Sequence, residues 1–127
     1  MAAATKYALA PTGSTGNVTG ASVETTNIVE DAQIAFQFVV EVAGATPTIT
    51  YKYQGSLDNV NWYDLIYFTD ANDTLSVATR TVTAVGATVQ WLDSGNNSRM
   101  YKFFRVVPTA NTNITYRAEM YAFNIPR

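Results

Sequence analysis

Hydrophobic and polar residues alternate with a period of two over most of the chain beyond residue 20. The alternation is clearest in 32–42, where Gln33, Gln37 and Glu41 occupy the polar positions. The opposite face carries Ile34, Phe36, Phe38, Val40 and Val42. Because successive side chains of a strand point to opposite sides, this pattern predicts a β-strand with one buried face.

Further segments show the same alternation or short aromatic and β-branched runs. They are 48–53, 62–68, 76–84, 88–92, 100–107 and 114–123. The segment 44–47 contains Gly44 and Pro47 and is expected to join its two neighbours as a hairpin, because glycine allows positive φ and proline cannot donate to a ladder. We therefore expect an all-β fold, an antiparallel two-sheet β-sandwich of immunoglobulin-like or jelly-roll-like type, over residues 21–127.

Residues 1–20 differ from the rest of the chain in composition, because Ala, Thr, Gly, Ser and Asn dominate them. They bury too little apolar surface to offset an ordering cost of about 1–2 kcal/mol per residue, so we expect an extended, flexible N-terminal arm. A frayed terminus and an arm that orders by pairing with a partner's sheet edge both fit this composition. In the second case Tyr7 and Leu9 are the anchors.

Charge and residue types narrow the function further. The 127-residue chain has no Cys and no His, and its 8 Lys and Arg nearly balance 10 Asp and Glu. Because Cys is absent, disulfides and thiolate metal sites are excluded. Because His is absent, the chain lacks the residue that most often serves as a general base or a zinc ligand. No basic field is present to hold nucleic acid, and no apolar run reaches the ~18 residues of a membrane span. We expect no enzyme, no cofactor, no nucleic acid and no membrane partner.

Metal binding has one candidate segment. Asp70, Asn72 and Asp73 offer oxygen ligands to Ca²⁺, but they lack the glycine, spacing and bidentate acid of a calcium loop. We expect a solvated turn there and no metal site.

One motif carries a family resemblance. A strand ends in Gln54-Gly55-Ser56, a turn is made of Asp58-Asn59-Val60-Asn61, and Trp62 begins the return strand. This hairpin, with the later strand 101–107, resembles one found in small β-sandwich structural proteins of tailed-phage virions, several of which are capsid decoration (cement) proteins. The resemblance implies a virion protein on the capsid exterior that binds the major capsid protein, associates with itself as a homotrimer, and stabilises the shell against internal DNA pressure.

A second family offers an alternative. Discoidin-like jelly rolls have a similar Ser-x-Asp-x-x-x-Trp hairpin and bind carbohydrate or lipid through loops. This chain lacks the flanking Cys pair common in that family and is short for that fold. A tail-associated or discoidin-like carbohydrate-binding module for host recognition remains the alternative function.

Aromatic residues on both faces of the predicted strands are candidates for partner binding, because Tyr and Phe give large contact area with few rotors to freeze. The candidates are Tyr7, Leu9, Phe104, Tyr121 and Phe123. The alternative is that one face of each strand is core and the other a solvated rim.

Overall fold

The computed structural model describes residues 3–17, 19–24, 33–65, 67–68, 75–76, 79–91 and 101–124. Within them all regular structure is β-strand and the strands pair antiparallel, which confirms the all-β, sandwich-like prediction. The strands are β1 (Ala3–Ser14), β2 (Val23–Glu24), β3 (Gln33–Ser56), β4 (Tyr63–Asp64), β5 (Tyr67–Phe68), β6 (Leu75–Ser76), β7 (Arg80–Val82), β8 (Gly86–Trp91) and β9 (Phe103–Asn124). This part of the chain has no helix long and apolar enough to cross a membrane.

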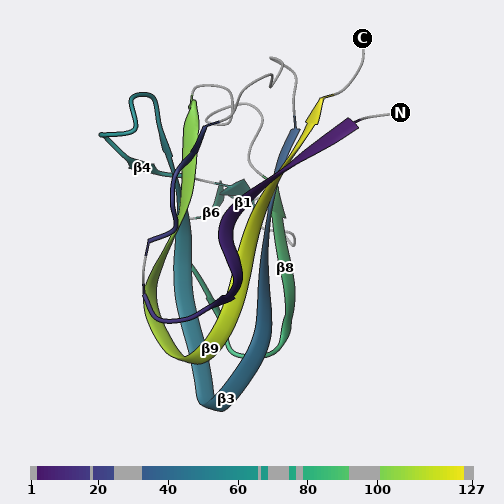
Figure 1. Cartoon of the computed structure of the whole chain (residues 1–127), viewed down its shortest axis with the longest axis vertical. Helices are drawn as coiled ribbons and strands as arrows, with labels where there is room; N and C mark the ends of the chain where they lie inside the picture. The colour runs from purple at the N-terminus through teal and green to yellow at the C-terminus, as the bar shows by residue number, and fades with distance from the viewer. Residues whose placement is uncertain are drawn as a thin grey trace.

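Two long strands, β3 and β9, form the centre of the fold (Figure 1). They pair with each other from Gln33 to Ser56 of β3, and both turn over about halfway along. The paired ribbon therefore folds back on itself and makes two layers out of the same two strands. Layer A contains 33–43 and 114–124, and layer B contains 48–56 and 103–110. We call the end at which both strands turn over, at the bottom of Figure 1, the narrow end.

The shorter strands extend both layers. In layer A, β1 pairs with β9 and β8 pairs with β3. In layer B, β2 pairs with β9, whereas β4 and β7 pair with β3. Strands β5 and β6 form a separate two-stranded sheet.

Aromatic rings fill the space between the layers. Phe36 of layer A stacks on Tyr53 of layer B with ring centroids 4.2 Å apart, and Phe38 stacks on Tyr51 at 3.8 Å. Tyr116 of β9 adds a further stacked ring, 5.0 Å from that of Phe38. The predicted alternation explains this core, since the even positions of 34–40 are buried and together remove a large apolar area from water.

The predicted hairpin at 44–47 is wrong, because the residues before and after it do not pair with each other but both pair with β9. The glycine and proline mark a corner where β3 passes from layer A to layer B. Pairing with β9 is irregular between Ala43 and Thr48, so Pro47 interrupts no regular ladder, and Thr46 has a φ of 42°. The segments 100–107 and 114–123, expected as separate strands, are joined in the single strand β9, which begins at Phe103. Pro108 between them is tolerated because it lies beside a register shift at Tyr51.

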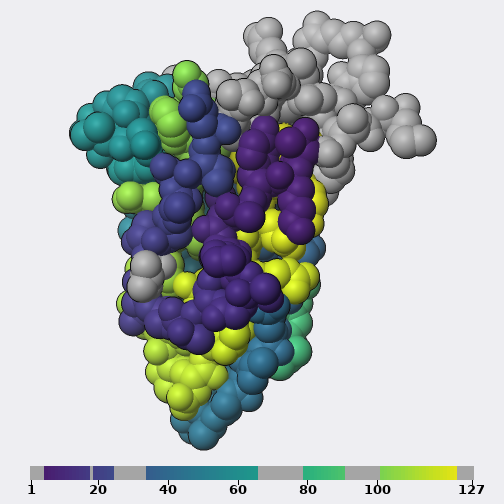
Figure 2. All heavy atoms as spheres, in the orientation of Figure 1, coloured from purple at the N-terminus to yellow at the C-terminus, as the bar shows by residue number. Residues whose placement is uncertain are grey.

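Residues 3–14 differ from the expected flexible arm, because they form β1 and pair with β9 from Ala3 to Ser14. Leu9 and Ala10 lie in the core, at 2% and 6% exposure, so the segment buries more apolar surface than its composition suggested. Figure 2 shows this segment lying across the C-terminal half of β9. Gly20 continues the attachment in layer B, where its N–H donates to the Val106 carbonyl at 2.9 Å. Use of 1–20 as an arm toward a partner stays a prediction.

Candidate interaction surfaces

The five residues predicted to bind a partner lie in three different environments. Leu9 and Phe104 are core residues, at 2% and 0% exposure, and contact the chain's own interior. Tyr121 on β9 is half-buried and shares the outer face of layer A with Lys6. Tyr7 on β1 is also half-buried, but it lies opposite the buried Met120 and packs against the core. Phe123 lies on β9, opposite Ala4 and Gln33, but its side chain is outside the described part of the structure.

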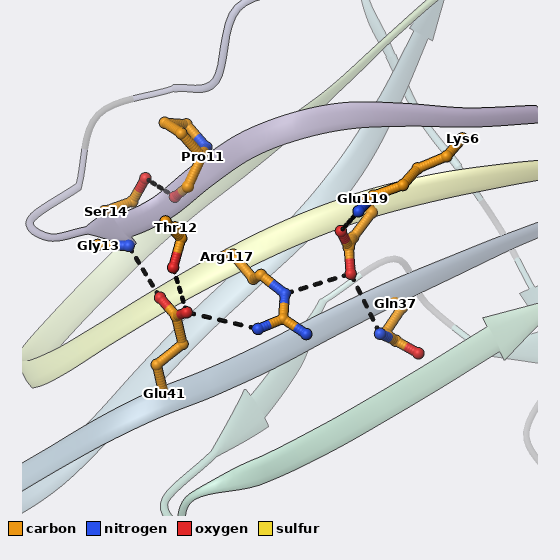
Figure 3. Close-up of polar contacts among 9 residues, drawn as sticks. All are labelled: Lys6, Pro11, Thr12, Gly13, Ser14, Gln37, Glu41, Arg117 and Glu119. Carbon is orange, nitrogen blue, oxygen red and sulfur yellow. Dashed lines mark hydrogen bonds and ion pairs between the residues drawn. The ribbon is translucent and has the colours of Figure 1, made fainter.

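Tyr121 lies on the outer face of layer A beside a network that we call the β1 clasp, made of Lys6, Thr12, Gly13, Gln37, Glu41, Arg117 and Glu119 (Figure 3). Its central group is the Glu119 carboxylate, which is 5% exposed. Lys6 of β1 lies 2.9 Å from the Glu119 carboxylate, and Arg117 lies 3.3 Å from it. The Gln37 amide donates to the same carboxylate at 3.2 Å. The clasp therefore connects β1, β9 and β3 across the sheet.

The second carboxylate of the clasp holds the end of β1. Glu41 accepts a hydrogen bond from the Gly13 N–H at 2.8 Å and another from the Thr12 hydroxyl. Arg117 lies 3.4 Å from the same carboxylate, so it bridges Glu41 and Glu119. This region of β1 has register shifts in its pairing with β9, and the side-chain contacts replace ladder hydrogen bonds there.

The hydrogen bonds of the β1 clasp shift the pKa values of its charged side chains. Burial of the Glu119 carboxyl disfavours its charge, but hydrogen bonds from Lys6 and Arg117 outweigh burial and keep its pKa below the ordinary value. The pKa of Glu41 is lowered chiefly by the hydrogen bonds from Thr12 and Gly13. The pKa of Lys6 is raised by its hydrogen bond to Glu119. All three groups are therefore charged at neutral pH, as the clasp requires.

A second surface is the loop 57–62, which we call the hairpin tip and which projects beside β4 at the upper left of Figure 1. Two buttressing side chains hold its shape. The buried Ser56 hydroxyl accepts from the Asn59 N–H at 2.9 Å. The Asp58 carboxylate accepts from the N–H groups of Asn61 at 2.8 Å and Val60 at 2.9 Å, and these bonds hold its pKa well below the ordinary value.

The base of the hairpin tip is braced by aromatic residues. The Arg105 guanidinium lies 4.0 Å from the centre of the Trp62 ring and donates to Gln54 at 2.9 Å. Tyr63 packs near Tyr101, with ring centroids 6.2 Å apart. These contacts connect the return strand to β9 and make the tip a rigid projection.

Two of the exposed side chains of the hairpin tip are apolar. Val60 is 75% exposed and Leu57 60% exposed, and Tyr63 next to the tip is 54% exposed. The Asp and Asn residues of this segment predict the turn, but they do not indicate a role for Leu57 or Val60. The presence of two apolar residues inside a polar turn could have indicated an interaction surface, because the hydrogen bonds that hold the turn do not involve their side chains.

A third surface is a groove of about 540 Å³ at the narrow end. It is lined by Thr15, Gly16, Val42, Gly44, Ala45, Asn111, Asn113, Ile114 and Thr115. Val42 was expected on the buried face of its strand, but it is 59% exposed because the pairing shifts by one residue between Val40 and Val42. Such a shift moves the following side chain to the other face of the sheet.

Within the described residues no group of three or more Asp and Glu side chains is arranged to hold a metal ion. The calcium loop considered for Asp70, Asn72 and Asp73 lies outside those residues.

The fold is similar to that of one solved structure. A crystal structure titled SPBc2 prophage-derived protein YomS superposes with a TM-score of 0.64, covering 97% of this chain and 95% of that chain at 9% sequence identity. At this identity the likeness shows a shared fold. No family model and no curated protein matches the sequence.

Proposed function

We propose that this chain is a non-enzymatic structural protein of a tailed-phage virion, and specifically a decoration (cement) protein on the outside of the capsid. The observation that carries the proposal is the shared fold with a prophage-derived protein over nearly the whole length of both chains. The Ser56–Trp62 hairpin, whose sequence resembles that of virion sandwich proteins, supports it with a rigid, projecting turn.

The construction of the two layers suits a protein that carries load. Because β3 and β9 run through both layers, a force that separates the layers acts along continuous chains as well as on packing. A close-packed aromatic core transmits strain with little deformation.

In this proposal the outer face of layer A binds the major capsid protein, with Tyr121 as the aromatic contact at its surface. A standard interface of about 1,600 Å² across the seam between two capsid subunits must be broken before they separate. Repetition over the shell multiplies the effect of each contact. The proposal includes self-association, with the homotrimer that the sequence resemblance implies.

The test is the thermal disruption temperature of purified capsids with and without the protein. Binding accompanied by a higher disruption temperature supports a cement function, and an unchanged temperature at saturating protein contradicts it. A Tyr121→Asp variant should bind capsids more weakly, with Tyr63→Asp as the matched control on layer B. Saturable sugar binding that is lost in Tyr63→Asp would instead favour the carbohydrate-binding module.

A further inference from the structure

We propose that Arg105, on the outer face of layer B, binds a carboxylate, and that this carboxylate belongs to an acidic side chain of a partner protein. The site lies where β4, β3 and β9 pair side by side, away from the narrow end (Figure 1). The inference goes beyond the proposed function, which has its capsid contact on layer A, and does not depend on it.

A row of three side chains crosses the outer face of layer B at this position. Asp64 of β4 lies opposite Gln54 of β3, and Gln54 lies opposite Arg105 of β9. The Gln54 amide donates to the Asp64 carboxylate at 2.9 Å and accepts from the Arg105 Nε–H, also at 2.9 Å. Lys52 lies 3.1 Å from the Asp64 carboxylate. The charge of Asp64 is therefore paired with Lys52, while Arg105 contacts the row only through a neutral amide.

Two contacts fix the orientation of the Arg105 guanidinium. Gln54 holds its Nε–H, and the guanidinium carbon lies 4.0 Å from the centre of the Trp62 ring. Within the described part of the chain, its terminal Nη1 and Nη2 groups have no hydrogen-bond or ion-pair partner. Because Nε is already used, an incoming carboxylate is bound through Nη1 and Nη2 together. This is a two-bond geometry that arginine offers to a planar anion.

The environment of Arg105 differs from that of Arg117, which also lies on β9. Arg117 is within 3.4 Å of Glu41 and Glu119, and its hydrogen bond to Glu119 raises its pKa. Burial instead lowers the pKa of Arg105, which is half-buried. A half-buried cation without a counter-ion is costly, and an incoming carboxylate offsets that cost. Ion pairs with carboxylates also hold the three lysines Lys6, Lys52 and Lys102.

The side chains around Arg105 favour a protein as the partner. Phe103 and Val107 are its neighbours on the same face of β9, and both are half-buried, as is Trp62. Arginine and aromatic residues are enriched at protein interfaces, and apolar surroundings strengthen a charge pair at their centre. The patch therefore fits an acidic side chain that is itself flanked by apolar residues.

Sugars and nucleic acids fit the site less well. A sugar needs a free aromatic face and several free polar groups, but the Arg105 guanidinium covers one face of the Trp62 ring and both ends of the Gln54 amide are used. A nucleic acid needs several cations for its phosphates, whereas Asp64 and Glu24 put negative charge on the same face.

The first experiment titrates the isotope-labelled chain with the capped tripeptide Val-Glu-Val and, as the matched ligand, with capped Val-Gln-Val. The NMR shifts of the Arg105 Nε–H and of the Trp62 indole N–H report binding at the site. The glutamate peptide should bind at least about tenfold more tightly, because only its carboxylate pairs with the guanidinium. Equal binding of the two peptides, or no shift with either, contradicts the proposal.

The second experiment repeats the titration with variants. Arg105→Gln should bind the two peptides equally, and Arg105→Lys should bind the glutamate peptide at least about threefold more weakly than the wild type, because lysine lacks the planar pair of donors. Lys102→Gln is the matched control, since it removes an exposed cation beside Phe103 that is paired with Glu24. It should bind as the wild type does. A loss in Lys102→Gln as large as that in Arg105→Gln would show general charge attraction and overturn the site.

Titration with inorganic phosphate and with galacturonate separates the classes of ligand. Tighter binding of either one than of the glutamate peptide would overturn the acidic side chain as the ligand, and weaker binding of both supports it. These titrations use no capsids, so their outcome is independent of the cement function.

Discussion

The ring of Phe38 stacks on the ring of Tyr51 with an interplanar angle of 5°, although both residues belong to the single strand β3. The contact is possible because the strand turns over between them and brings its second half onto its first. The stacking of two rings from one strand therefore depends on the folding of the β3–β9 ribbon back on itself.

We predict that Phe38→Ala lowers the free energy of unfolding by about 3–5 kcal/mol, since it removes a fully buried ring that touches both layers. A double-mutant cycle of Phe38→Leu and Tyr51→Leu should show a coupling energy of about 0.5–1.5 kcal/mol. Urea denaturation measures both values. Additive effects of the two leucine substitutions would contradict a direct stack.

The β1 clasp makes stability depend on pH. Glu119 and Glu41 have lowered pKa values in the folded chain, so their contribution is complete above the ordinary glutamate pKa of 4.5. It is lost as the pH falls through the folded-state values, because the unfolded chain binds protons more readily. We expect the free energy of unfolding to fall with decreasing pH below 4.5, and Glu119→Gln to reduce that dependence.

Glu119→Gln should also loosen β1 at neutral pH. The substitution replaces a charge-assisted set of hydrogen bonds and should cost about 1–3 kcal/mol. Measured by hydrogen exchange, the substitution should accelerate exchange of the backbone amides more in β1 than in the β3–β9 ladder. Equal acceleration throughout the sheet would mean that β1 does not open separately from the rest of the sheet. Lys52→Gln on layer B serves as the control for loss of an exposed ion pair.

The hairpin tip should keep its shape in acid after the clasp has weakened. The pKa of Asp58 lies well below that of an ordinary aspartate, because hydrogen bonds from Asn61 and Val60 stabilise its charged form. We predict that its carboxyl stays ionised where other aspartates are protonated, as carboxyl NMR titration will measure. Ordinary titration of Asp58 would show that the turn is not preformed.

The cation–π contact at the base of the tip gives a fluorescence test. Arg105→Gln removes the guanidinium above Trp62 and should cost about 0.5–2 kcal/mol. The chain has two tryptophans, so the emission of Trp62 is followed in a Trp91→Phe background. A changed emission with Arg105→Gln is expected, and unchanged emission would place Arg105 away from the indole.

The predictable part of the fold follows from local pattern. The alternation in 34–40 identified the buried face because one face of a strand must leave water, and the structure buries those positions. The corner at 44–47 was predicted as a hairpin turn, because glycine and proline serve both purposes and only pairing with the distant β9 distinguishes them. Leu9 gave no local sign of burial, since the surface that covers it is made by residues far along the chain.

The candidate surfaces were harder to predict than the fold. Val42 faces outward because of one shifted pair in the ladder, a change that its neighbours in sequence do not reveal. Leu57 and Val60 stand out only when the turn around them is known to project. Phe104, selected for its aromatic ring, is core because its ring packs toward layer A, 6.2 Å from that of Phe36.

The central place of β9 has a consequence for the order of events during synthesis. Strands β1, β2 and β3 all hydrogen-bond to β9, which is made after them. Until β9 is translated, β1 and β2 lack the strand with which they pair, and β3 can pair only with β4, β7 and β8. Sheet formation then requires contacts between residues as distant as Ala3 and Asn124, so folding should be slow and largely post-translational.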